Sequence, residues 1–437
     1  MQFHLLSFEG PDGYARAGGL ASRVTGLAET LAELGFETHL WFIGDPDLPG
    51  DEVRGSLHLH RWCQWVSRYH PGGVYDGEAG KVGEYGASLP PHLVGEVLLP
   101  HLAAGGRGVV VAEEWQTVHA VLHVDWLLRH VGARPRVSVL WNANNTFGFE
   151  SIPWGRLAQA ATITTVSRYM KHRMREWGVD ALVIPNGLTL DAFDPPERAV
   201  VQELRRRFRD RTLLLKMARW DPDKRWLGTV ELVAELKRQG WRPLLVARGG
   251  CEPHGAEVLA AAAARGLRVA HRQAPGPGAA GLFEALRDVG DADLVNLRSV
   301  VDATGRRALF RGVDAVLANS GHEPFGLVGL ETMAAGGLAC TGCSGEDYAV
   351  PGQNALVLET EDPREFMGLF RKLHLHPDLG RQLRRAGQAT ARRYAWREIV
   401  DRVLLPRVEL RQEASYEAPP RACLVRGTAA MALRNAG

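Results

Sequence analysis

Short apolar runs alternate with amphipathic segments along most of the chain. Runs typical of buried strands occur at residues 3–8, 38–43, 109–113, 137–140, 161–166, 213–218, 243–247, 267–270, 294–297 and 313–318. Between them, apolar residues recur at helical spacing, as at Val24, Leu27, Ala28 and Leu31 before Gly35. Strands separated by helices predict parallel, doubly wound α/β sheets, which bind ligands at the carboxyl ends of their strands.

The strand–helix alternation starts twice, which predicts two domains. The chain has 437 residues, a natural length for two α/β domains with a cleft between them. The turn at Pro185, Asn186 and Gly187 is suited to a linker. We therefore expect a first domain over 1–188 and a second over 189–394. Residues 395–437 would form a last helix, opened by Tyr394 and Ala395 and running to about Leu410, followed by a tail.

Two segments lack a sustained period. Residues 61–91 are rich in Trp, Tyr, Gly and His and predict an extended loop region. Its aromatic side chains could stack on a sugar acceptor, and a packed surface insertion is the alternative. The tail from Glu413 onward has mixed composition and would either be mobile or contribute contacts in an oligomer.

Composition narrows the function classes. The chain carries 52 basic and 50 acidic side chains, a formal charge of +2, so a nucleic-acid partner is not expected. The amino-terminal residues lack a signal-peptide pattern and no apolar stretch reaches membrane-spanning length, which favours a cytoplasmic location without a transmembrane segment. Cys340 and Cys343 form a CxxC without the other half of a zinc site, so neither a metal nor a disulfide framework is expected.

The stretch NSGHEPFGLVGLETMAA, residues 319–335, carries the clearest chemistry. It predicts the end of a strand, a tight loop and a helix whose first backbone N–H groups, at Gly326, Leu327 and Val328, attract phosphate. Glu323 would lie in the loop and Glu331 about one and a half turns along the helix. Two carboxylates beside a phosphate site suggest sugar hydroxyls, and two solvated carboxylates are the alternative.

The string EPFGLVGLE at 323–331 resembles the paired-glutamate motif of retaining glycosyltransferases with the GT-B fold, notably family 4 and its glycogen and starch synthase relatives. The resemblance extends over residues 1 to about 410 and implies two Rossmann-like domains facing a cleft. It implies that Glu323 binds the sugar hydroxyls of a nucleotide sugar and Glu331 its ribose diol. Phe325 belongs to the same donor-binding loop.

Two further motifs carry the resemblance. Gly18, Gly19, Leu20 and Ala21 match the GGLA loop of the glycogen synthase clan, in which these residues face the donor diphosphate. The string ARWDPDKRW, residues 218–226, is similar to a Gly-Arg-x-x-x-x-Lys element with alanine in place of glycine. Arg219 and Lys224 would then bind the diphosphate. Lysine occurs only at residues 81, 171, 216, 224, 237 and 372, so its presence here is informative.

One motif departs from the family pattern. The relatives have His-Asp-Trp or His-Glu-Trp after the strand at 109–113, and here Glu113 takes the place of the histidine that faces the sugar. His119 in the following helix could partly substitute. Glu113 or Glu114 could instead hold the acceptor or the sugar.

The resemblance implies retaining transfer of a hexosyl unit, with glucosyl the first expectation, from a nucleotide diphosphate sugar to a hydroxyl acceptor. The catalytic candidates are Arg219, Lys224, Glu323 and Glu113, and neither cofactor nor metal is needed. The departing phosphate would take the acceptor's proton. A non-catalytic nucleotide-sugar-binding protein, or an epimerase or phosphorylase on the same fold, remains an alternative. The sequence leaves open the donor base, the acceptor and the oligomeric state.

Overall fold

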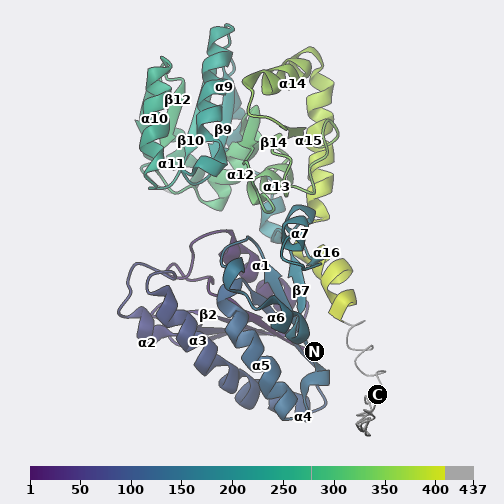
Figure 1. Ribbon diagram of the computed structural model, residues 1–437. Coiled ribbons are helices and arrows are strands. Elements are labelled where there is room, and N and C mark those ends of the chain that lie inside the picture. Colours follow the sequence, from purple (N-terminus) through teal and green to yellow (C-terminus); the bar gives the residue numbers. More distant parts are fainter. Residues whose placement is uncertain (277, 409–437) are drawn as a thin grey trace, which may run out of the picture.

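The computed structural model describes residues 1–276 and 278–408, which form two α/β domains joined by a narrow waist (Figure 1). The first domain is built on an eight-stranded sheet and the second on a seven-stranded sheet. The predicted doubly wound architecture is confirmed. Within the described residues, no helix combines the length and apolar character needed to cross a membrane.

The first sheet has the strand order β3-β4-β2-β1-β5-β6-β7-β8, and every neighbouring pair is parallel except β3 with β4. Its inner strands are buried on both faces, as the continuous apolar runs predict. The strands are β1 (Gln2–Leu6), β2 (Glu37–Ile43), β3 (Asp51–Arg54), β4 (Leu57–Trp62), β5 (Gly108–Glu113), β6 (Val137–Ala143), β7 (Thr162–Thr165) and β8 (Leu182–Val183).

Helices cover both faces of this sheet. On one face α1 (Gly19–Glu33) packs with the last described helix of the chain in a core that includes Leu27, Leu31 and Val400. The other face carries α3 (Glu78–His92), the π-helical η1 (Leu93–Leu98), α4 (Leu99–Ala103), α5 (Val118–His130), α6 (Trp154–Ala160) and α7 (Arg168–Arg175). Short helical turns lie at α2 (Gln64–Ser67), η2 (Trp115–Thr117), η3 (Arg134–Arg136) and η4 (Phe149–Ser151).

The prediction of an extended loop over 61–91 is wrong. Strand β4 continues to Trp62, and α3 occupies the second half of the segment. Glycines and prolines hide the helical period in the sequence, but the helix buries Tyr85, Leu89 and the Lys81 side chain. The Lys81 ammonium donates to the Tyr14 hydroxyl at 2.7 Å and to the Gly73 carbonyl at 2.9 Å. Tertiary burial therefore outweighs the poor helix propensity of this segment.

The second sheet has the order β11-β12-β10-β9-β13-β14-β15, and all of its pairs are parallel. Predicted strands correspond to observed ones, although β11 begins two residues later than expected. The strands are β9 (Thr212–Met217), β10 (Pro243–Arg248), β11 (Val269–Arg272), β12 (Leu294–Leu297), β13 (Ala315–Ala318), β14 (Ala339–Thr341) and β15 (Leu356–Val357).

Helices also cover both faces of the second sheet. One face packs against α9 (Trp226–Arg238), α10 (His254–Ala264), α14 (Pro363–Leu375) and α15 (Pro377–Arg392). The opposite face packs against α8 (Arg198–Arg207), α11 (Gly278–Ala285) and α12 (Ala303–Gly312). Helix α13 (Leu327–Ala334) starts at the waist, and short turns lie at η5 (Leu190–Phe193) and η6 (Pro222–Lys224).

The two domain connections cross at one point. The Leu188 N–H donates to the Tyr394 carbonyl at 2.8 Å, and the Trp396 N–H donates to the Leu188 carbonyl at 2.9 Å. The Trp396 ring lies on Gly187, where a Cβ would come within 2.4 Å of it. After this crossing, α16 (Trp396–Ile399) and η7 (Val400–Leu404) return along the first domain (Figure 1). The predicted tail from residue 413 lies outside the described residues.

Candidate functional site

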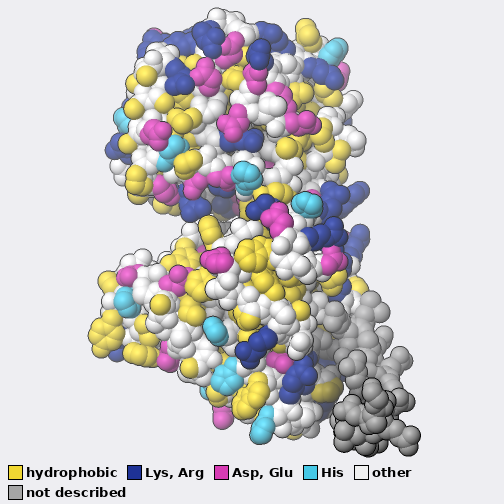
Figure 2. Space-filling model, viewed as in Figure 1, with side chains coloured by type: hydrophobic (Ala, Val, Ile, Leu, Met, Phe, Trp, Pro, Cys, Tyr) yellow, Lys and Arg dark blue, Asp and Glu magenta, His cyan; other side chains and the backbone are white. Residues whose placement is uncertain are grey.

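The two domains face each other across a cleft, visible as the notch in Figure 2. The amino ends of α1 and α13 meet there, because a Cβ on Gly19 would lie 3.6 Å from Leu327 Cδ1. The structure therefore brings together two predicted donor-binding segments from different domains. The positive ends of both helix dipoles are directed toward the same space.

The loop from β13 to α13 is fixed by its aromatic anchor. Phe325 is only 2% exposed and packs against Tyr348 and Tyr394, with ring centroids 5.8 and 6.1 Å away. Gly326 caps the helix at φ 83°, a conformation that favours glycine, and its carbonyl accepts from the Tyr348 hydroxyl. The Phe325 side chain is therefore part of the core, and its contribution to a donor site is to hold the N–H groups of Gly326, Leu327 and Val328 in place.

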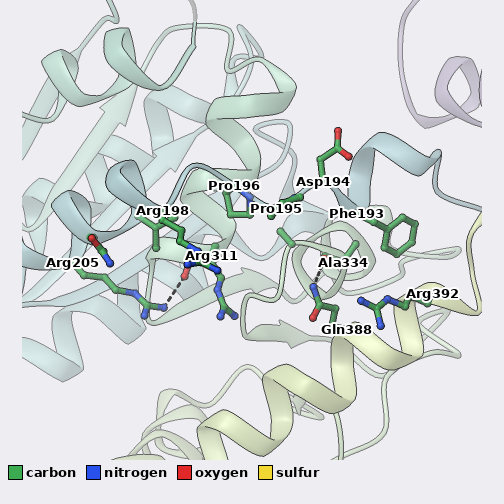
Figure 3. Close-up of a pocket in the computed structure, with 13 residues that line it drawn as sticks. Phe193, Asp194, Pro195, Pro196, Arg198, Arg205, Arg311, Ala334, Gln388 and Arg392 are labelled. Atoms are coloured by element: carbon green, nitrogen blue, oxygen red, sulfur yellow. Dashed lines mark hydrogen bonds between the residues drawn. The ribbon is translucent and has the colours of Figure 1, made fainter.

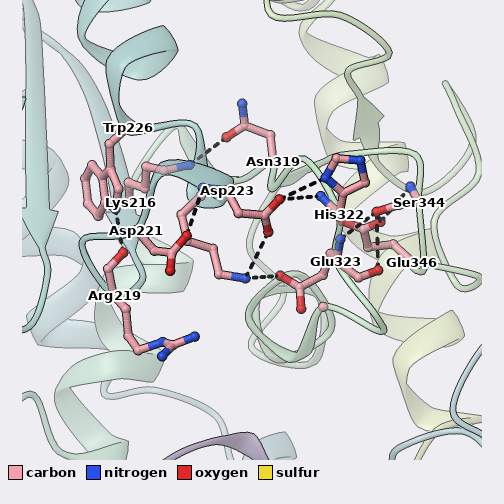
Figure 4. A network of polar contacts seen from close by, with 12 residues as sticks. Lys216, Arg219, Asp221, Asp223, Trp226, Asn319, His322, Glu323, Ser344 and Glu346 are labelled. Carbon is pink, nitrogen blue, oxygen red and sulfur yellow. Dashed lines mark hydrogen bonds and ion pairs between the residues drawn. The ribbon is translucent and has the colours of Figure 1, made fainter. Parts of the chain in front are cut away.

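Lys224 and Glu323 form an ion pair at the mouth of the α13 helix (Figure 4). The Lys224 ammonium lies 2.8 Å from Glu323 Oε2, and each side chain is about one-fifth exposed. Asp223 ties the two loops together, because its carbonyl accepts from the Gly321 N–H at 2.7 Å and its carboxylate from the His322 N–H at 2.9 Å. Two residues predicted separately as donor ligands thus lie side by side.

Arg219 extends from the β9–α9 loop with an exposed side chain (Figure 4). Trp226 braces its backbone by donating from Nε1 to the Arg219 carbonyl at 2.7 Å, and the next N–H, of Trp220, donates to Glu252 at 2.9 Å. In the described part of the chain, the Arg219 guanidinium has no hydrogen-bond or ion-pair partner. The Arg219 backbone is therefore fixed, while its guanidinium is available to bind an anion in the cleft.

Two residues of this network were missed in the sequence. The Ser344 hydroxyl accepts from the Glu323 N–H at 2.9 Å, and Glu346 accepts from the Ser344 N–H at 3.1 Å. Burial, with Glu323 nearby, raises the pKa of Glu346 to about 7. The signal was the polar string SGED directly after the β14 run, at the carboxyl end of a strand beside β13.

Glu331 borders a cavity of about 110 Å³ between the domains. Its Oε1 lies 3.5 Å from the Arg306 guanidinium, and burial raises the pKa of the carboxyl. The connection between the two domains at residues 185–191, called the hinge below, lines the cavity together with α1 and α16. These segments contribute Ser22, Gly187, Leu188, Thr189, Asp191 and Trp396. Glu331, the residue predicted to bind the ribose, therefore faces a cavity that also contacts Leu327 at the amino end of α13.

Glu113 does not face the cleft as predicted. Its Oε1 accepts from Arg23 Nε at 2.9 Å, and its Oε2 accepts from the side-chain amides of Asn142 and Asn144, each at 2.8 Å. Arg23 also donates to the Asn186 side chain at 2.7 Å, and Glu113 and Arg23 are 1% and 2% exposed. Sequence adjacency to the family motif suggested a substrate contact, but the structure places Glu113 in a buried ion pair that links β5, β6, α1 and the hinge.

The cleft wall of the first domain instead carries Glu9, Tyr75 and Glu114. Glu9 Oε2 accepts from the N–H groups of Gly18 at 2.8 Å and Ala21 at 3.0 Å, and the Tyr75 hydroxyl donates to Oε1 at 2.7 Å. The N–H of Gly18 is therefore occupied by a protein carboxylate, while Gly19 and Leu20 lie next to α13. Glu9 was missed, although it follows the first apolar run at the carboxyl end of β1.

Glu114 occupies an unusual backbone conformation, with φ 69° and ψ 167°. A non-glycine residue held in this sparsely populated region marks local strain. Its carboxyl accepts from the Asn144 N–H at 2.7 Å, and burial raises its pKa to about 8. A carboxyl with a raised pKa is more readily protonated, and it can then donate a hydrogen bond. His119 is exposed on α5 beside Gly86 of α3.

A separate cavity of about 520 Å³ lies in the second domain, at the opposite end of α13 (Figure 3). The linker after the hinge, α8 and α15 line it, and it contains none of the predicted site residues. Four arginines border it, and Arg205 donates to the Arg311 carbonyl at 2.8 Å. The predicted residues converge on the interdomain cleft, which is therefore the candidate active site.

Comparison with known proteins agrees with this geometry. Residues 17–192 match the family model described as Glycosyltransferase Family 4. Among curated proteins, none matches the sequence significantly.

Similar solved structures cover nearly the whole chain. Sucrose-phosphate synthase from Thermosynechococcus elongatus has a TM-score of 0.63 at 19% identity, covering 94% of this chain and 99% of that one. The UDP-forming α,α-trehalose-phosphate synthase from Burkholderia xenovorans, in complex with glucose-6-phosphate, has a TM-score of 0.64 at 14% identity, covering 94% and 100%. The catalytic domain of starch synthase IV from Arabidopsis thaliana, bound to ADP and acarbose, has a TM-score of 0.61 at 14% identity, covering 94% and 98%.

These similarities show the fold of the whole chain. The chain has the GT-B fold, and residues 17–192 are similar to the Glycosyltransferase Family 4 model.

Proposed function

We propose that the protein is a retaining glycosyltransferase that moves a hexosyl unit, with glucosyl the first candidate, from a nucleotide diphosphate sugar to a hydroxyl acceptor. The observation that carries this proposal is the pairing of Lys224 with Glu323 at the amino end of α13, opposite the amino end of α1. A cation, a hydroxyl-binding carboxylate and the anion-attracting amino end of α13 then share one cleft, with the amino end of α1 opposite.

The donor would lie along the second domain. Arg219, Lys224 and the N–H groups at 326–328 bind the diphosphate, Glu323 binds sugar hydroxyls, and Glu331 binds the ribose diol in its cavity. A diphosphate at Lys224 would share the ammonium with Glu323, which holds the carboxylate beside the transferring sugar. The solved relatives with UDP-forming activity or with bound ADP support a nucleoside diphosphate as leaving group, and they leave the base open.

The chemical step develops negative charge on the diphosphate as the anomeric C–O bond breaks. Arg219, Lys224 and the helix N–H groups are already oriented toward that charge, so they stabilise it without reorganisation. The acceptor oxygen bonds to the anomeric carbon on the same face, and its proton passes to a departing phosphate oxygen. No separate base is required, so Glu113 can remain in its ion pair.

The acceptor would lie against the first domain. Glu9 can accept hydrogen bonds from acceptor hydroxyls, and Glu114, whose pKa is raised, can donate one when it is protonated. Tyr75 holds the Glu9 carboxylate in place. A polar wall of this kind suits a sugar or another polyhydroxylated acceptor.

A second candidate function is a non-catalytic nucleotide-sugar-binding protein. The observation that favours it is the buried ion pair of Glu113, which leaves the position of the family's sugar-facing histidine without a group that reaches the cleft. Both candidates share the donor site. They differ in whether the anomeric C–O bond of the nucleotide sugar is broken.

The test is a panel of UDP-, ADP-, GDP- and TDP-sugars with simple sugars and sugar phosphates as acceptors. Nucleoside diphosphate release is measured, and the anomeric configuration of the product is read by NMR. Release with one donor and retained configuration support the transferase. Inverted configuration would contradict the retaining mechanism. Thermal stabilisation by one donor without release under any acceptor would favour the binding protein.

A further inference from the structure

The first sheet carries a row of histidines at the end that faces away from the cleft. His4 of β1, His39 of β2 and His58 of β4 are direct neighbours in the strand register. Their rings stack, with centroids 4.8 Å apart for His4 and His39 and 4.5 Å apart for His39 and His58. His60 follows on the same face of β4, because alternate residues of a strand share a face. These residues lie toward the amino ends of their strands, whereas the cleft lies at the carboxyl ends.

We propose that Glu37, His39 and His58 form a binding site for a divalent transition metal, with Zn²⁺ the first candidate. One ligand atom from each residue lies within 4.8 Å of the other two, and His39 Nε2 is 3.4 Å from Glu37 Oε1. Two ligands about 2.1 Å from a tetrahedral zinc ion lie roughly 3.4 Å apart. The His39–Glu37 spacing already fits, and His58, whose ring stacks on His39, must turn its ring to bring a nitrogen to the ion.

The proton arrangement leaves a lone pair at the required atom. Asp51 Oδ1 lies 2.6 Å from His60 Nδ1, and a carboxylate only accepts, so His60 carries its proton there. Neutral His60 then accepts at Nε2, 2.9 Å away from His39 Nδ1, which must donate. Neutral His39 consequently presents an unprotonated Nε2 toward Glu37. A metal-binding histidine typically donates a hydrogen bond from its other ring nitrogen, as His39 does from Nδ1 to His60.

His4 belongs to the support of the site and not to its ligands. Trp41 Nε1 donates to His4 Nδ1 at 3.4 Å, and His4 Nε2 lies 3.0 Å from Gln2 Oε1. Both ring nitrogens of His4 are therefore in use. The Gln2 amide nitrogen, 3.3 Å from His39 Nε2, is the donor that a bound ion would displace.

Burial and exposure are those of an accessible three-ligand site. The His39 side chain is 6% exposed, whereas Glu37 is 47% exposed and leaves an entry path from solvent. Three protein ligands leave a fourth position for water. The ion would link β2 to β4 and stabilise the fold, and it would not contact the nucleotide sugar in the cleft.

The test measures metal binding directly. The full-length protein is dialysed against a chelator and titrated with CoCl₂ and then ZnCl₂, with the visible spectrum of cobalt and the metal content recorded. We expect one ion per chain, a four-coordinate cobalt spectrum, displacement by zinc and a higher melting temperature with metal. No spectrum, or metal content that does not rise above background, would overturn the proposal.

Three variants locate the ion. Glu37→Gln and His58→Asn are expected to abolish the four-coordinate spectrum, and the exposed Asp51→Asn to weaken affinity by about tenfold through the His60–His39 chain. His130→Asn, on the exposed side of α5, is the matched control and should bind as the wild type does. Unchanged binding in both ligand variants, with folding verified by circular dichroism, would place the ion elsewhere and contradict the assignment.

Discussion

The two walls of the cleft are built differently. The second-domain wall consists of short loops that carry their ligands in compact motifs, such as Arg219 with Lys224, and its groups are partly exposed. The first-domain wall consists of carboxyl groups that are buried and held by residues distant in sequence. Glu9 and Tyr75, for example, are 66 residues apart. In the proposed function the compact loops supply fixed cations for a diphosphate, whereas the acceptor would contact a network that the whole domain shapes.

The largest expected effect concerns stability in the interior of the first domain, behind its cleft wall. Glu113→Ala leaves Arg23 buried without its partner, and breaking a buried ion pair typically costs about 3–5 kcal/mol. The free energy of unfolding, measured by urea denaturation, should fall by an amount of this order. The surface variant Glu398→Ala, which removes an exposed pair with Arg402, is the control and should change it by less than about 1 kcal/mol. Equal effects would show that the Glu113 pair is not a structural brace.

The second effect concerns turnover on the second-domain wall. In the proposed mechanism Lys224 stabilises the leaving diphosphate, so Lys224→Ala should lower kcat/KM by about 10²–10³ while stability changes little. Lys372→Ala, on the exposed face of α14, is the matched control. If Lys224→Ala turned over at the wild-type rate, the assignment of Lys224 to the diphosphate site would be wrong.

A third effect is the pH dependence contributed by Glu114. Burial raises the pKa of this carboxyl from 4.5 to about 8, so the folded state retains a proton that the unfolded state has already lost between these values. The stability contribution of Glu114 is therefore fully present below about pH 4.5 and is lost as the pH rises toward 8.

Glu114→Gln isolates this contribution, because other groups, such as Glu346, also titrate in the same range. Urea denaturation at pH 5, 6, 7 and 8 should show the stability of the variant rising relative to wild type with increasing pH. A constant difference across the series would mean that Glu114 ionises normally.

The smallest expected effect is at Glu331. Glu331→Gln weakens a hydrogen-bonded contact to the ribose without touching the breaking bond, so KM for the donor should rise by about tenfold with kcat nearly unchanged. Initial rates over a range of donor concentrations separate the two constants. A fall in kcat with constant KM would assign Glu331 to the chemical step.

The same contrast explains what could be predicted from the sequence. The sequence could predict that Lys224 and Glu323 lie at one cleft, because each motif is local and its loop geometry follows from Gly and Pro positions. Glu9 and Ser344 were missed, and Glu113 was placed wrongly, because their roles depend on contacts from distant strands.

Contacts between segments distant in sequence also determine helix α3 and the histidine row, which the sequence did not predict. Helix α3 forms where propensity favours a loop, because Tyr85 and Leu89 become buried against the sheet. The histidine row depends on the register of β1, β2 and β4, in which His39 pairs with both His4 and His58. Register cannot be read from one strand, although the alternation at His58 and His60 offered a partial signal.

The most direct test of the donor assignment is a calorimetric titration of UDP and ADP into the wild type, Lys224→Ala and Tyr75→Phe. The account predicts that one nucleotide binds the wild type, that Lys224→Ala weakens this binding at least about tenfold, and that Tyr75→Phe, altered on the acceptor wall, binds as the wild type does. Equal affinity in the wild type and Lys224→Ala, or a loss confined to Tyr75→Phe, would contradict it.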